Sequence, residues 1–246
     1  MKKIVILGAL SAIARQVARQ IVGHDVEMLL VGRSPRRLAE LRRDLQLRGS
    51  KRVEIFQADL ENLEEQRAAY EYARRQLVDF DVLLLAYGAL LDPKSAVCDS
   101  QWVTRQLTVN FVSAAAALTL FAEHFEKRME GCLAAITSVA GDRGRPANYV
   151  YGSAKGGLAL FLQGLRARLH PCGVSVITIK PGPVDTPMTE FFQPRRLLAR
   201  PESVAAEIVR ALERRRPAVL YTPAYWRPLM AGIRALPEPI MRRLQI

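Results

Sequence analysis

Tyr151 and Lys155 stand four residues apart in the sequence, and Ser138 precedes the tyrosine by thirteen. Residues at i and i+4 share one face of a helix, so a helix here would point the phenol and the ammonium into one site. A nearby cation favours phenolate and is expected to lower the pKa of the tyrosine from its usual value of about 10. Ser138 follows an apolar run, residues 132–137, typical of a buried strand. Because ligands collect at the carboxyl ends of strands in open α/β sheets, these side chains predict a proton-transfer site there.

The beginning of the chain carries a pattern that fits a phosphate-binding turn. An apolar run over residues 4–7 ends at Gly8, and apolar side chains then recur at helical spacing from Ile13. A strand, a tight turn and a helix in this order place backbone N–H groups and the helix dipole where a pyrophosphate can bind.

A second apolar strand, residues 26–31, is followed by Arg33 and Ser34, and Pro35 comes next. Ser34 is a good N-cap with the proline at the first helical position. After this strand an acidic residue would bind a ribose 2′-hydroxyl, whereas an arginine accommodates a 2′-phosphate, so Arg33 predicts a preference for NADP(H). The alternative is that Arg33 merely follows the strand into solvent.

Strand-like and helix-like segments alternate along the whole chain, which predicts an α/β fold with a doubly wound, mostly parallel seven-stranded sheet and helices on both faces. At 246 residues and 50% hydrophobic content, a single domain over residues 1–246 is expected. The expected strands cover residues 4–7, 26–31, 53–57, 82–87, 132–137, 174–180 and 218–222. The expected helices cover residues 12–22, 35–47, 62–78, 101–127, 151–169 and 201–214.

Together these motifs resemble the classical short-chain dehydrogenase/reductase family, a single-domain Rossmann fold, over a core of residues 4–214. The matching positions are Gly8, Ala12, Ile13, Ala14, Ala58, Asp59, Leu60, Ala86, Tyr87, Gly88, Asn110, Ser138, Tyr151, Lys155 and residues 181–187. Two motifs depart from the family pattern. Alanines at positions 12 and 14 replace the second and third glycines of the first turn, and Leu-Ala-Tyr-Gly at residues 85–88 replaces Asn-Asn-Ala-Gly.

The resemblance implies a mechanism in which hydride passes from NADPH to a carbonyl carbon while Tyr151 donates a proton to the developing alkoxide. Lys155 would hydrogen-bond the nicotinamide ribose and hold the tyrosine pKa low, and Ser138 would polarise the carbonyl oxygen. Asn110 would hold a water that links Lys155 to bulk solvent. The alternative for Asn110 is a polar helix residue facing solvent. Its apolar neighbours instead favour a buried partner.

The resemblance also assigns residues to the cofactor, with Asp59 at the adenine and Thr186 at the nicotinamide end. The full implied set is Gly8, Ser11, Ala12, Ile13, Arg33, Ser34, Asp59, Leu60, Ala86, Tyr87, Gly88, Tyr151, Lys155, Pro181, Gly182, Val184 and Thr186. By family position, residues 188–200 would form a lid over the substrate. The paired Phe191 and Phe192 in it suggest an apolar substrate body, and its arginines suggest an anionic group.

The variant motifs at residues 8–14, 31–33, 85–88 and 138–144 resemble a bacterial subgroup labelled as reductases of decaprenylphosphoryl 2-keto-pentose. This resemblance suggests a lipid-linked keto-sugar as substrate and an oxidase partner. The alternative function is a catalytically idle NADP(H)-binding regulator or partner subunit, to which the altered glycine turn points. The intact Asn110, Ser138, Tyr151 and Lys155 favour the enzyme, and the family resemblance implies a homo-oligomer, dimer or tetramer, formed through the two long helices.

The formal charge of +12 is concentrated late in the chain, where residues 195–246 hold eleven arginines and four glutamates. The tail, residues 223–246, mixes aromatic, aliphatic and basic residues, and it is too short and too charged to span a bilayer. Two interpretations stand equal: peripheral contact with a membrane surface, or packing over the pocket or a subunit interface. No nucleic-acid-binding module is recognisable, so a solvated basic surface is expected rather than a nucleic-acid footprint.

Three scattered cysteines and three isolated histidines lack metal-ligand spacing, so we expect no metal site and no disulfide framework. They are Cys98, Cys132, Cys172, His24, His124 and His170. Residues 1–14 imitate a short signal peptide, but its cleavage would remove the first strand and Gly8. We therefore expect a cytoplasmic protein, with possible contact at the inner membrane face.

Overall fold

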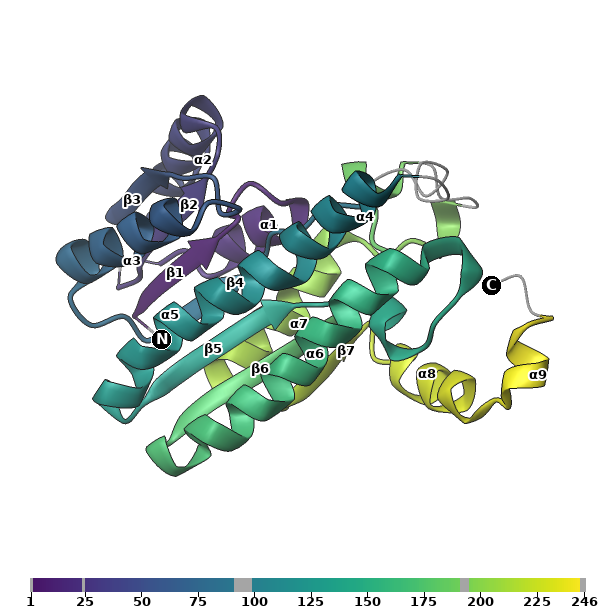
Figure 1. Ribbon diagram of the computed structural model, residues 1–246. Helices are drawn as coiled ribbons and strands as arrows, with labels where there is room; N and C mark the ends of the chain where they lie inside the picture. The colour runs from purple at the N-terminus through teal and green to yellow at the C-terminus, as the bar shows by residue number, and fades with distance from the viewer. Residues whose placement is uncertain (1, 24, 91–98, 191–194, 244–246) are drawn as a thin grey trace.

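A computed structural model describes residues 2–23, 25–90, 99–190 and 195–243. Its seven strands form one sheet in the order β3-β2-β1-β4-β5-β6-β7 (Figure 1), and every neighbouring pair is parallel. The strands are β1 (Lys3–Leu7), β2 (Glu27–Gly32), β3 (Arg52–Gln57), β4 (Val82–Leu85), β5 (Gly131–Ile136), β6 (Val174–Pro181) and β7 (Val219–Thr222). The predicted doubly wound parallel sheet is confirmed.

Helices cover both faces of this sheet, and the alternation of side chains along each strand explains why the strands read as continuous apolar runs. The helices that precede the tail are α1 (Ala12–Gln20), α2 (Pro35–Leu47), α3 (Leu63–Leu77), α4 (Ser100–Leu107), α5 (Ser113–Arg128), α6 (Tyr149–Leu169) and α7 (Pro201–Arg214). In β1, Ile4 and Ile6 pack under α1, α2 and α7, whereas Val5 and Leu7 pack under α3, α5 and α6.

The sheet changes its winding direction between β1 and β4, because β2 lies beside one edge of β1 and β4 beside the other. The connections that leave these two strands diverge to opposite sides, so a crevice opens at their carboxyl ends. The fold therefore places its ligand crevice beside Gly8, after β1, and beside Gly88, after β4.

The helix predicted over residues 101–127 is continuous but not uniform, because a π-helical turn, Thr108–Val112, joins α4 to α5. Such turns insert one residue into a helix and are frequent at functional sites. The run Ser100–Arg128 is long and apolar enough to cross a membrane by length and composition, with a mean hydropathy of 1.2. Half of the most apolar 18-residue stretch of this run is buried. Ala117, Leu118 and Phe121 pack under the sheet, as in a core helix.

The described part of the tail folds back onto the domain. It forms α8 (Trp226–Ala235) and α9 (Glu238–Met241), and the Met230 and Met241 side chains are buried. Arg143 donates to a carboxylate oxygen of Glu238 at 2.8 Å, which ties α9 to the segment that follows β5. The two interpretations of the tail, contact with a membrane surface and packing over the pocket or a subunit interface, stay predictions.

One of the isolated histidines and one of the cysteines lie in the core, whereas His170 is exposed and Cys172 is half-buried. His124 is buried and stacks on Phe80 with ring centroids 3.9 Å apart, and Cys132 is buried in β5. Within the described residues no group of three or more His, Cys, Asp or Glu side chains could hold a metal ion. Cys98 and His24 lie outside the described residues.

Candidate active site

Ser138, Tyr151 and Lys155 converge at the carboxyl end of β5. The Lys155 Nζ lies 5.9 Å from the centroid of the Tyr151 ring and donates a 3.2 Å hydrogen bond to the carbonyl of Ile136, the last residue of the strand. The Ser138 hydroxyl lies near enough to the Tyr151 phenol to lower its pKa, and it accepts from the backbone N–H of Ala140 at 3.1 Å. The predicted cluster of phenol, ammonium and hydroxyl is therefore present.

Two glycines of α6 make this convergence possible, and the sequence analysis did not single them out. A Cβ on Gly152 would stand 2.8 Å from the Ala140 carbonyl oxygen, and one on Gly156 would stand 2.8 Å from the Gly141 carbonyl oxygen. The backbone of α6 thus rests directly on the backbone of the segment after Ser138. The four-residue spacing of the glycines, one position after Tyr151 and Lys155, is the signal that could have revealed this contact.

Asn110 occupies the π-helical turn, and its side chain is fully buried. Its Nδ2 donates to the carbonyls of Ala89, at 2.7 Å, and Gln106, at 3.0 Å, while its Oδ1 accepts from the Ala89 N–H at 3.1 Å. The buried partner expected for this amide is therefore the main chain that follows β4. A Cβ on Gly88 would lie 2.7 Å from Asn110 Oδ1 and 3.0 Å from Lys155 Nζ, so the amide and the ammonium meet across this glycine.

The electrostatics of the tyrosine differ from the sequence-based expectation. Burial raises the pKa of Tyr151 to about 12, and the hydrogen bond from Ser138 lowers it only in part. Burial also lowers the pKa of Lys155 to about 8. The expectation that the lysine would lower the tyrosine pKa is wrong for this state of the chain, because removing both groups from water disfavours both charged forms and outweighs their attraction.

A cavity of about 500 Å³ lies at the switch point of the sheet and holds eight of the residues assigned to the cofactor. Those eight are Gly8, Ser11, Arg33, Ser34, Asp59, Leu60, Tyr87 and Gly88. The volume and the position are typical of a nucleotide-binding crevice. The cavity also reaches Ala89, whose carbonyl accepts from Asn110, and Val109, which precedes Asn110 in the sequence. The cavity therefore ends beside Asn110.

The first turn of α1 fits a pyrophosphate despite its two alanines. Gly8 adopts a φ of +80°, which side chains disfavour, and a Cβ there would stand 2.6 Å from the Cβ of Tyr87. The Ser11 side chain caps α1 by accepting from the Ala14 N–H at 3.2 Å. The backbone N–H groups of Ala12 and Ile13 in the first turn still lack an intrahelical acceptor. Free N–H groups at this position of a helix are the donors that a phosphate oxygen accepts from. The methyl group of Ala14 is buried in the core, away from this turn.

The cavity carries two cations besides Arg33. Arg33 lies in the cavity wall with Arg37 and Arg105, and the acidic groups there are Asp59 and Glu61. Arg33 Nη1 lies 3.9 Å from Glu61 Oε1, and the arginine side chain is 69% exposed. Because this ion pair is exposed, the Arg33 guanidinium can turn toward a ligand phosphate without breaking a buried ion pair. The Ser34 hydroxyl accepts from the Arg37 N–H. Arg37 follows the N-cap Ser34 by three residues, and this helical spacing is the feature of the sequence that could have placed Arg37 beside Ser34.

The remaining residues assigned to the cofactor do not line the cavity. Ile13 packs against the core beneath the turn, Ala86 is buried, and its N–H donates to the Leu7 carbonyl at 2.8 Å. Ala12 begins α1, and Tyr151 and Lys155 lie in α6. Pro181 ends β6, and Gly182, Val184 and Thr186 belong to the connection after it. Their contacts with a nicotinamide remain predictions.

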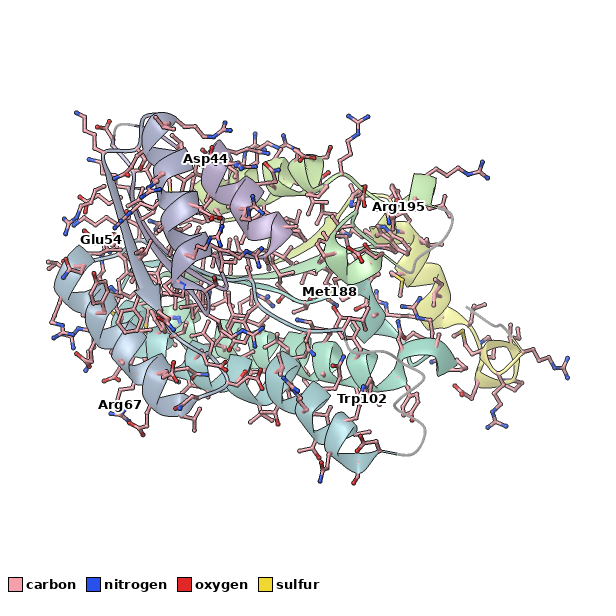
Figure 2. The ribbon with its side chains drawn as sticks, turned by 90° about the horizontal axis from the view of Figure 1, so that it is seen from above. Asp44, Glu54, Arg67, Trp102, Met188 and Arg195 are labelled. Carbon is pink, nitrogen blue, oxygen red and sulfur yellow. The ribbon has the colours of Figure 1, made fainter. Side chains whose placement is uncertain are left out.

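The connection after β6 is held by main-chain bonds. The Gly182 N–H donates to the Thr222 carbonyl at 3.0 Å, and the Ala199 N–H donates to the Pro183 carbonyl at 3.0 Å. Arg195, expected at an anionic substrate group, forms an ion pair with Asp185 instead. Met188 and Arg195 lie at the end of the molecule that carries α8 (Figure 2). The paired phenylalanines and the rest of residues 191–194, the centre of the predicted lid, lie outside the described residues.

Comparison with known proteins identifies relatives over nearly the whole chain. The family model for short chain dehydrogenase matches residues 2–196. An uncharacterized oxidoreductase of Mycobacterium tuberculosis is 33% identical over 241 residues, which cover 98% of this chain and 96% of that protein. An uncharacterized oxidoreductase of Streptomyces coelicolor is 31% identical over 251 residues, which cover 100% and 96%.

Solved structures share the fold at lower sequence identity. The alcohol dehydrogenase of the archaeon Thermococcus sibiricus, complexed with 5-hydroxy-NADP, superposes with a TM-score of 0.80 at 21% identity, covering 90% of this chain and 94% of that one. A structure titled ElxO with NADP bound gives a TM-score of 0.78 at 19% identity, with coverage of 89% and 96%.

Proposed function

This chain belongs to the short-chain dehydrogenase family, and from that premise we propose that it is an NADP(H)-dependent oxidoreductase interconverting a ketone and a secondary alcohol. The observation that carries the proposal is the cluster of Ser138, Tyr151 and Lys155 at the end of β5, where Lys155 lies beside Gly88 in the wall of the nucleotide-sized cavity. A regulator that only bound nucleotide would have no use for a half-buried phenol beside a serine hydroxyl and a buried lysine.

The proposed chemistry divides between the cofactor and the chain. NADP(H), when bound, supplies or accepts the hydride. Tyr151 donates the proton to the alkoxide oxygen in the reductive direction, and a pKa of about 12 keeps its phenol protonated at neutral pH. Ser138 hydrogen-bonds the carbonyl oxygen and aligns it with the phenol. Lys155 and Asn110 border the same glycine, which suits a path that returns a proton to Tyr151.

The preference for NADP(H) rests on charge. Three arginines and two carboxylates line the cavity, and the expected 2′-phosphate position lies beside Arg33 and Ser34. Relatives of the same fold carry NADP or an NADP derivative by their titles, which supports the same choice for this chain.

The substrate proposed is a lipid-linked keto-sugar, on the motif resemblance described above, and an oxidase acting before this protein would supply it. A homo-oligomer and a cytoplasmic location, with contact at the inner membrane face, belong to the same proposal. The idle-subunit alternative is favoured by the alanines of the first turn, but the open amides of Ala12 and Ile13 weaken it.

The test is NADPH oxidation by the full chain with a panel of ketones that includes polyprenyl-phosphate keto-sugars. Tyr151→Phe should lower the rate by about 10²–10⁴-fold while leaving NADPH affinity unchanged, because only the transferable proton is lost. Tyr149→Phe is the matched control, since Tyr149 is 50% exposed on the same helix and should have no effect. A Tyr151→Phe protein as active as the wild type would contradict the proposed role.

A further inference from the structure

A second cavity, larger than the nucleotide-sized one, has a volume of about 670 Å³ and borders the segment that follows Ser138. It is bounded by α6, by the strands β6 and β7, by α8 and by the residues after Ser138. None of its lining residues lines the nucleotide-sized cavity, so the two cavities are separate. The proposed reaction does not use it.

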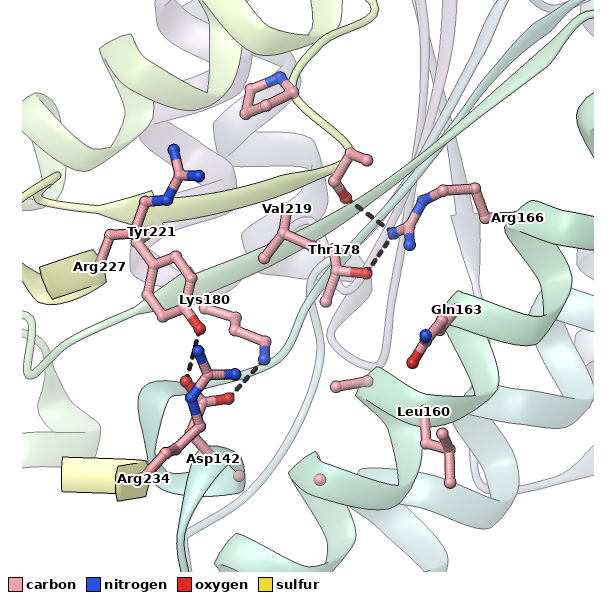
Figure 3. A pocket seen from close by; sticks show the side chains of 15 residues that line it. Asp142, Leu160, Gln163, Arg166, Thr178, Lys180, Val219, Tyr221, Arg227 and Arg234 are labelled. Carbon is pink, nitrogen blue, oxygen red and sulfur yellow. Dashed lines mark hydrogen bonds and ion pairs between the residues drawn. The ribbon is translucent and has the colours of Figure 1, made fainter. Parts of the chain in front are cut away.

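The walls of this cavity are strongly cationic. Four basic side chains face one carboxylate, and they come from three different elements: Arg166 from α6, Lys180 from β6, and Arg227 and Arg234 from α8 (Figure 3). The single carboxylate is Asp142.

The carboxylate of Asp142 is already fully engaged. Its side chain is 2% exposed, it forms an ion pair with Lys180, and it accepts a 2.7 Å hydrogen bond from the Tyr221 hydroxyl. Both bonds are drawn in Figure 3. One cation and the one anion of the cavity therefore cancel, and the charge of the three arginines is left over.

The guanidinium of Arg166 is fixed in place without any carboxylate. Its Nε donates to the Val176 carbonyl at 2.8 Å, and its Nη2 donates to Thr178 Oγ1 and to the Ala218 carbonyl, both at 2.7 Å. Burial lowers the pKa of this arginine, which shows that its charge is partly removed from water. A partly desolvated cation held only by neutral oxygens is a favourable binding partner for an anion.

The other two arginines stand on the opposite wall. Arg227 and Arg234 are seven residues apart on α8, so they share one face of the helix. Neither makes an ion pair with a carboxylate within the described residues. Figure 3 shows Arg166 on one side of the cavity and these two on the other.

We propose that this cavity binds an organic phosphate with two or more negative charges. Each arginine guanidinium can donate two parallel hydrogen bonds to a pair of phosphate oxygens. The charge of three arginines is matched better by a diphosphate ligand than by a ligand with a single carboxylate group. The volume suits a small molecule rather than a bare ion, and Leu160, Pro217 and Val219 give an apolar wall for its organic part. The phosphate is that of a free metabolite or of a lipid headgroup, and the inference is independent of the proposed oxidoreductase activity.

The test has two arms on the full chain at low salt, where charge interactions are least screened. The first is a calorimetric titration with inorganic pyrophosphate, and the second is flotation with vesicles that contain phosphatidate. The test variant is Arg227→Ala/Arg234→Ala, whose side chains are exposed and whose loss should leave the fold intact.

Two control variants remove the same charge elsewhere. Arg67→Ala/Arg75→Ala alters α3, and Arg67 lies at the far end of the molecule from α8 (Figure 2). Arg33→Ala/Arg37→Ala alters the nucleotide-sized cavity, which can itself bind a pyrophosphate, and reports binding there. We expect the test variant to lose about tenfold or more in pyrophosphate affinity, and Arg67→Ala/Arg75→Ala to bind as the wild type does. A loss confined to Arg33→Ala/Arg37→Ala would assign the pyrophosphate to the nucleotide-sized cavity and overturn the proposal.

Vesicle flotation that is lost only in the test variant, without pyrophosphate binding, would assign the phosphate to a lipid headgroup. The proposal is overturned if the wild type binds neither probe. It is also overturned if the test variant binds as well as the wild type, or if all three variants lose affinity equally.

Discussion

The indole of Trp226 lies against the main chain of Gly182, where a Cβ on the glycine would stand 1.9 Å from the indole nitrogen. The Gly182 N–H is held from the same side by the Thr222 carbonyl at 3.0 Å. The tail therefore clamps the connection after β6, which is the segment expected at the nicotinamide end of the cofactor. Trp226, the first residue of α8, thus restrains this segment although it lies far from it in the sequence.

This contact predicts a specific coupling. Gly182→Ala should destabilise the fold by about 1–3 kcal/mol, because the added methyl overlaps the indole. Trp226→Ala removes the overlapping indole, so the double variant should be more stable than the sum of the two single effects. Denaturant unfolding of the four proteins measures this coupling. Strictly additive effects would show that the two residues do not restrain each other.

The glycines of α6 predict an effect on catalysis. Gly156→Ala should push α6 away from the Gly141 carbonyl, separate Tyr151 from Ser138, and lower kcat more than it raises KM. Gly164→Ala is the matched control in the same helix, because a Cβ there meets nothing within 4 Å. The control should keep full activity and gain up to about 1 kcal/mol of stability from helix propensity. Equal activity of the two variants would refute the proposed close packing.

The buried lysine predicts a pH dependence of stability. The pKa of Lys155 is lowered to about 8 in the folded chain, from 10.5, so between these values the unfolded state binds more protons and stability rises with pH. Below pH 8 both states are protonated and the full burial cost is present. Lys155→Met should therefore be more stable than the wild type at neutral pH, and its advantage should shrink as the pH rises toward 10. Denaturant unfolding at several pH values checks this, and a constant difference would contradict it.

Much of the fold could be predicted from the sequence because its signals are local. The five inner strands are buried on both faces, so each reads as an apolar run, and the cap by Ser34 follows from the residue type and Pro35 beside it. The catalytic set followed from spacing along one helix and from one strand end.

The rest depends on packing between distant segments, which spacing does not encode. The pKa of Tyr151 was predicted in the wrong direction because burial is a property of the folded chain and outweighs the nearby charge. Arg37 and Arg105 reach the cavity from separate elements. The contact between Trp226 and Gly182 joins two segments whose residue types give no hint of each other.

The central claim is that this chain uses NADP(H), and calorimetry with NADPH and NADH tests it most directly. The wild type should bind NADPH more tightly, and Arg33→Ala/Arg37→Ala should lose about tenfold or more for NADPH with little change for NADH. Arg36→Ala is the control, since Arg36 is largely exposed and pairs with Glu40 outside the cavity. Equal affinity for both nucleotides, unchanged by the double substitution, would contradict the assignment, and no binding of either would mean that the turn at Gly8 does not hold a pyrophosphate.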